Sequence, residues 1–151
     1  MSHSNVPAFD STIQTTNVWL HDIMDRLGWQ ERSRAYHALR AVLHALRDRL
    51  PVDQAAALGA QLPMLIRGFY YEGWHPHDKP FKERKKEEFL AHVAQALRGT
   101  LEGEPETIAR VVFQVLAKHV TPGEVSHIKL ALPHELRDLW SPETHAHWFH
   151  Q

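Results

Sequence analysis

The chain has 151 residues, of which 43% are hydrophobic and 23% charged, proportions typical of a globular domain and not of a disordered tail. Seventeen basic and eighteen acidic residues leave a formal charge of −1, which excludes a bulk attraction for nucleic acid or an anionic membrane. The lack of cysteine excludes disulfides and thiolate metal sites. Residues 1–14 lack the basic and apolar regions of a secretory signal, and no apolar run reaches the roughly 18 residues of a membrane span, so we expect a soluble cytoplasmic protein.

The first half of the chain has the periodicity and the breaks of four helices. Residues 1–8 are expected to form a disordered N-terminal segment. Gly28, Pro51 and Pro63 then end or open helices, because glycine favours the left-handed cap and proline cannot continue a helix. Apolar residues recur every three or four positions between these breaks. The helices are predicted over residues 11–27, 31–49, 52–61 and 63–70.

The second half repeats this pattern after a linker predicted over residues 76–80, which holds two prolines. Thr121 and Glu124 predict a capping box, in which each side chain accepts a hydrogen bond from the backbone amide of the other residue. Pro133 opens the last short helix. No segment has the sustained alternation of a strand, and the predicted fold class is all-α.

The two halves align with each other at an offset of 70 residues and without a gap. Leu62-Pro63 meets Leu132-Pro133, and Arg67 meets Arg137. The identities fall on apolar helix faces and on helix breaks. The alignment predicts two tandem, pseudo-symmetric four-helix units packed as one compact helical domain. The predicted bounds are residues 9–75 for repeat unit 1, 81–141 for repeat unit 2 and 142–151 for a C-terminal tail.

Three stretches resemble a known family. They are LPMLIRGFYYEGWHP over residues 62–76, the triplet Glu88-Phe89-Leu90, and VLAKHVTPGEVSHIKLALPHELRDLW over residues 115–140. The chain is similar over roughly residues 9–141 to the bacterial domain of unknown function DUF2267. The resemblance implies an all-helical tandem fold. It brings no established activity, cofactor or catalytic residue.

Tyr70, Tyr71 and Trp74 form an aromatic cluster at the end of the first unit. Aromatic side chains supply large buried areas, so one interpretation is a plug between helices or between the two units. The other is an exposed aromatic surface that binds a partner.

Histidine pairs occur at equivalent places in the two units, since His75 and His77 meet His145 and His147 at the offset of 70. If the units pack about a twofold axis, the four imidazoles could converge on Zn²⁺, Ni²⁺ or Cu²⁺. The alternative is that polar residues gather in a linker and a terminus by default. Apart from such a transition metal, no cofactor is expected.

Five basic residues cluster over residues 79–86 and suggest a nucleic-acid surface. Acidic residues are interleaved with them, and Lys82 with Lys86 fall four apart, which is more typical of a solvated helix face. Arg67 and Arg137 are predicted to be buried, with their guanidinium groups on helix C-terminal carbonyls; an anion site is the alternative.

The search for catalytic motifs is negative. The glycines are isolated, so no phosphate-binding loop is present, and the run His134-Glu135-Leu136-Arg137-Asp138 has Asp where a zinc protease motif needs its second His. No catalytic residue is predicted. The predicted function is a non-enzymatic helical interaction or scaffold module of the bacterial cytoplasm, acting on a protein partner or by self-association. The alternatives are a metal-binding or metal-sensing protein and a nucleic-acid-associated protein.

Overall fold

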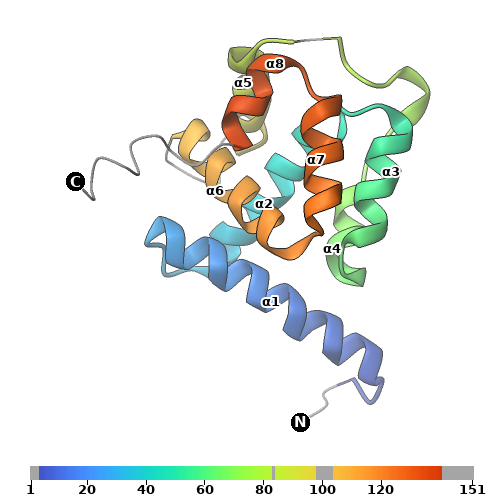
Figure 1. Ribbon diagram of the computed structural model, residues 1–151. Coiled ribbons are helices and arrows are strands. Elements are labelled where there is room, and N and C mark those ends of the chain that lie inside the picture. Colours follow the sequence, from blue (N-terminus) through green and yellow to red (C-terminus); the bar gives the residue numbers. More distant parts are fainter. Residues whose placement is uncertain (1–3, 83, 98–103, 141–151) are drawn as a thin grey trace.

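A computed structural model of the chain describes residues 4–82, 84–97 and 104–140 (Figure 1). All regular structure in these ranges is helical, which confirms the all-α prediction. None of these helices is both long and apolar enough to span a bilayer. The first half forms α1 (Pro7–Leu27), α2 (Arg32–Arg47), α3 (Val52–Gln61), α4 (Met64–Tyr71) and the 3₁₀ turn η1 (Pro76–Asp78). The second half forms α5 (Lys86–Leu97), α6 (Pro105–His119), α7 (Pro122–Ala131), α8 (His134–Arg137) and the 3₁₀ turn η2 (Asp138–Trp140).

Helix α1 begins at Pro7, earlier than the predicted start at residue 11. Pro7 occupies its first turn, where the fixed φ of proline suits a helix and its missing N–H is not needed. The segment predicted to be disordered therefore includes two residues of α1, and that boundary was wrong. The predicted end is correct, because Gly28 adopts a left-handed φ of 69° and its N–H donates to the carbonyl of Met24.

Helices α2 and α6 form the centre of the molecule. They pack against each other, α1 and α5 each contact both of them, and α3 lies beside α7 (Figure 1). Their inward faces are fully buried, as the periodicity predicted. The fully buried aliphatic side chains of α2 and α6 include Leu39, Val42, Leu43, Leu46, Val112, Val115 and Leu116.

An offset of 70 residues relates α1 to α5 and α2 to α6, and the contacts between helices follow the same correspondence. Contacts of α1 with α2 correspond to those of α5 with α6, and contacts of α1 with α6 correspond to those of α5 with α2. The pseudo-symmetric duplication itself stays a prediction. Helices α1 and α5 differ in length, since α1 has 21 residues and α5 has 12. The N-terminal half of α1 projects beyond the other helices in Figure 1.

Half of the predicted capping box is present at the start of α7. The Thr121 hydroxyl accepts from the backbone N–H of Glu124 at 3.2 Å. The Thr121 amide, however, donates to Oε1 of Gln61 at 3.0 Å, because the end of α3 lies beside it. The Glu124 side chain is buried instead, and its Oε2 has no hydrogen-bond partner among the described residues. The reciprocal bond predicted from the sequence was therefore wrong.

Burial raises the pKa of Glu124. Below its unfolded pKa such a carboxyl is protonated in both the folded and the unfolded state and does not lower the free energy of unfolding. As the pH rises through its folded pKa, the group ionises and destabilises the fold. We therefore expect Glu124→Gln to stabilise the protein at pH 7 by about 1 kcal/mol, and the gain to vanish towards pH 4. Thermal unfolding at both pH values measures this. The exposed Glu87→Gln on α5 is the control, and an equal gain from both variants, or a gain independent of pH, contradicts the argument.

Candidate partner-binding groove

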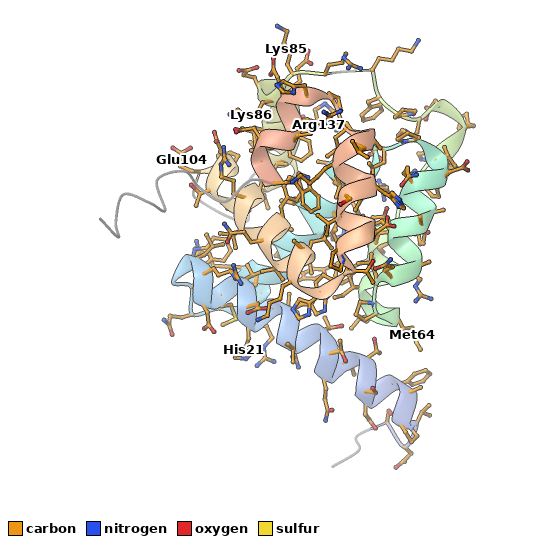
Figure 2. All side chains as sticks on the ribbon, in the orientation of Figure 1. His21, Met64, Lys85, Lys86, Glu104 and Arg137 are labelled. Atoms are coloured by element: carbon orange, nitrogen blue, oxygen red, sulfur yellow. The ribbon has the colours of Figure 1, made fainter. Side chains whose placement is uncertain are left out.

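An apolar groove of about 960 Å³ lies between α1, the start of α2, and α4. Its rim is made of large hydrophobic side chains that solvent reaches: Phe9 is 51% exposed, Ile13 48%, Met64 52% and Leu65 43%. Figure 2 shows Met64 at the edge of α4, beside the projecting half of α1. Four neighbouring apolar side chains with this exposure form a patch typical of an interaction surface.

One wall of the groove is a stripe along α1. Its members recur once per helical turn, singly or as adjacent pairs, and are Phe9, Thr12, Ile13, Thr16, Asn17 and Leu20. The spacing from Phe9 to Leu20 corresponds to about 16 Å of helix, or three turns. Leu20 is buried in the core, whereas Phe9 and Ile13 continue the same stripe past the point where the core ends. The projecting half of α1 therefore carries an apolar face with an open side.

Helix α4 forms the opposite wall of the groove, and α1 holds the N-terminus of α4. The Thr12 hydroxyl accepts from the backbone N–H of Leu65 at 2.9 Å, a first-turn amide that its own helix cannot satisfy. The side chain of Arg67 donates to the carbonyls of Gly59 at 3.0 Å and Leu62 at 2.9 Å, which ties α4 to the end of α3. These contacts set the angle at which α4 leaves the α3–α4 corner.

Basic side chains of α2 hold the other end of α4. The buried guanidinium of Arg47 donates to the carbonyls of Tyr70 at 2.6 Å and Glu72 at 2.8 Å. The ring of His44 lies 2.6 Å from the carbonyl of Phe69, and burial lowers the pKa of His44. The ring is therefore neutral at pH 7 and donates through its Nε2–H. With both ends of α4 fixed, the groove exists before any ligand binds.

The corresponding place in the second half is charged. At the offset of 70, Thr16, Tyr36, Leu65 and Gly68 correspond to Lys86, Glu106, Glu135 and Asp138. The Lys86 ammonium lies 3.6 Å from Glu106 and 3.4 Å from Asp138, and Arg110 pairs with the same two carboxylates at 2.8 Å each. The hydrogen bond from Arg110 lowers the pKa of Asp138. The two related surfaces therefore differ in chemistry, since one is an open apolar groove and the other is a self-paired ionic network.

The aromatic cluster predicted as a binding surface belongs mainly to the interior. Tyr70 is fully buried, and its hydroxyl donates to the carbonyl of Ala55 at 2.7 Å, so its assignment to a surface was wrong. The ring of Tyr71 packs on Gly59, where a Cβ would overlap it. Trp74 packs against Tyr71 with ring centroids 5.3 Å apart, and both are only partly exposed. For Tyr70 the structure thus agrees with the interpretation that the aromatic cluster packs between helices.

The histidine pairs are tested only in part. His75 and His77 are exposed in and beside η1, with ring centroids 6.3 Å apart. His145 and His147 lie outside the described residues. Among the residues that the structure describes, no three His, Asp or Glu side chains are placed to hold a metal ion. Convergence of the four histidines stays a prediction.

The basic segment is not one helical face. Helix α5 begins only at Lys86, so Lys82 and Lys86 do not share a face as their spacing suggested. Lys79 pairs with Asp78 at 2.7 Å, and Lys86 joins the ionic network. Figure 2 shows Lys85 and Lys86 at the end of the molecule opposite Met64. The segment is therefore distinct from the groove.

The paired arginines cap helices, as the packing interpretation predicted. Arg67 bonds to carbonyls at the end of α3, and Arg137 donates to the carbonyls of Leu132 at 3.3 Å and Leu130 at 3.4 Å, at the end of α7. The prediction that both are buried was wrong, because Arg67 is exposed and Arg137 only partly buried.

Residues 16–139 match the profile of a family described as uncharacterized conserved protein, DUF2267. No curated protein matches the chain. The sequence analysis missed the groove residues, although one signal for them was present. At the offset of 70, the apolar residues Ile13, Met64 and Leu65 correspond to Glu83, His134 and Glu135, so one unit is apolar where the other is polar.

Proposed function

The chain belongs to the DUF2267 family of uncharacterized conserved proteins, and from that premise we propose that it is a non-enzymatic interaction module of the bacterial cytoplasm. It binds an amphipathic helix of a partner protein in the groove between α1 and α4. The observation that carries this proposal is the apolar rim of Phe9, Ile13, Met64 and Leu65 around a preformed groove of about 960 Å³.

The dimensions of the groove favour a helix as its occupant. Its wall on α1 extends over about three turns, and an amphipathic helix presents an apolar stripe of the same period. The four half-exposed rim side chains amount to roughly 400 Å² of apolar surface. A stable dimer buries about 800 Å² on each partner, so the rim alone is too small to support self-association.

A titration followed by amide chemical shifts tests this function. The probe is a helical peptide of about 18 residues with leucines at the spacing i, i+3, i+4 and i+7 on one face. We expect the shift changes to cluster at Thr12, Leu65 and Gly68, because these residues line the groove. Changes confined to α7, or scattered over the whole surface, would remove the support for the proposal.

A matched pair of variants locates the site. Leu65→Glu places a charge on the rim and is expected to weaken peptide binding by more than tenfold, or about 1.4 kcal/mol. Leu130→Glu makes the same change on α7, where Leu130 is 72% exposed and lies outside the groove, and should leave binding unchanged. Equal losses from both variants would indicate non-specific hydrophobic adsorption.

A further inference from the structure

The groove has one polar end, formed where α2 begins. Arg32, Ser33 and Tyr36 line it from α2, and Asn17 lines it from α1. The polar groups of these four side chains form no hydrogen bond or ion pair with any other residue that the structure describes. The nearby Glu72 also lines the groove, but its carboxylate is paired with Arg40 at 3.2 Å. The polar end therefore carries one uncompensated positive charge.

This arrangement sets a requirement on the occupant. A helix that covers the polar end removes water from the Arg32 guanidinium. This desolvation costs binding free energy unless the helix supplies a hydrogen-bond acceptor. A carboxylate is the strongest acceptor for a guanidinium, since the pair forms charge-assisted bonds in a fork geometry. The first turn of α2 holds no acidic residue, and the exposed Glu31 at its N-cap forms no side-chain hydrogen bond to the helix.

We propose that the helix bound in the groove carries an acidic side chain at one end, and that this carboxylate is held by Arg32 with hydrogen bonds from Ser33, Tyr36 and Asn17. The other end of the groove, between Phe9 and Met64, takes large apolar side chains. The groove thus selects both the composition and the direction of its partner. This inference rests on the proposed function and specifies its ligand.

Two peptides of about 18 residues test the inference. They share one apolar face and differ only in a terminal Glu or Gln, and their dissociation constants are measured by fluorescence anisotropy. We expect the Glu peptide to bind about tenfold more tightly, and this difference to disappear in Arg32→Gln. The exposed Arg84→Gln removes a charge elsewhere on the surface and should preserve the difference.

The outcomes separate the two proposals. Equal affinities of the two peptides for the unaltered protein would overturn the acidic requirement and leave the groove as a helix site. A difference that persists in Arg32→Gln would overturn the assignment to Arg32. Binding of neither peptide would overturn both proposals. Binding of hexadecanoate without peptide binding would assign the groove to a small amphiphile and overturn the helix as occupant.

Discussion

Arg47→Met is expected to lower the free energy of unfolding by about 3 kcal/mol, which for a domain of this size lowers Tm by about 6–12 °C. The methionine retains the buried stem but removes the donors that reach the carbonyls of Tyr70 and Glu72. Those carbonyls belong to the end of α4, where no further helical turn satisfies them. The Tyr70 carbonyl is then left buried without its charged donor, and such losses are costly.

Arg40→Met is the matched control for this prediction. Arg40 lies two turns earlier on α2 and also binds the end of α4, through the side chain of Glu72 at 3.2 Å. Both partners of that ion pair are partly open to solvent, with 39% and 57% of their side chains exposed, so its loss should cost less than 1 kcal/mol. Thermal unfolding of the two variants measures the difference. Similar changes in Tm would mean that the buried carbonyl contacts do not hold α4 in place.

Gly68→Trp is expected to abolish peptide binding, with a loss well above tenfold, while the fold remains intact. Gly68 lines the groove in the middle of α4, and a Cβ at this position would meet no atom within 4 Å. The indole therefore extends into the open groove and takes the volume of the partner helix. Stability should be unchanged or higher, because glycine in a helix interior costs about 1 kcal/mol relative to alanine.

Gly123→Trp is the control for the blocking variant. Gly123 is exposed on α7 with similar open space around it, and it is not part of the groove. Calorimetric titration with the amphipathic peptide and thermal unfolding are measured for both variants. If Gly68→Trp binds the peptide as tightly as the unaltered protein, the peptide does not occupy the groove, and the proposed function fails.

The two halves differ at the position of the groove. The counterparts of residues 7–15 are residues 77–85, which precede α5, so the second half lacks the long α1 wall. Glu135 and Asp138 then lie where the first half has Leu65 and Gly68. Glu135 accepts a hydrogen bond from the backbone N–H of Lys86, and Asp138 pairs with the side chains of Lys86 and Arg110. This surface is therefore polar, whereas the groove of the first half is apolar. We infer that recognition lies on the first half.

Sequence reasoning identified the features that depend on neighbours along the chain. The helices, their buried faces, the left-handed stop at Gly28 and the arginines on helix ends all follow from periodicity and from the shape of glycine and proline. Only the first of the two bonds of the capping box was correct. The Thr121 amide donates instead to the side chain of Gln61, which is 60 residues away in the chain, and no local sequence pattern predicts such a partner.

The amino-acid sequence by itself determined an all-helical protein with two similar halves in its pattern, because helix faces and breaks are encoded within a few residues. Tertiary structure alone decided that Tyr70 is buried, that Oε2 of Glu124 has no hydrogen-bond partner among the described residues, and that Phe9 and Met64 stand on facing walls of one groove. These outcomes depend on the angles at which α1, α2 and α4 pack. Contacts between residues far apart in the chain set those angles.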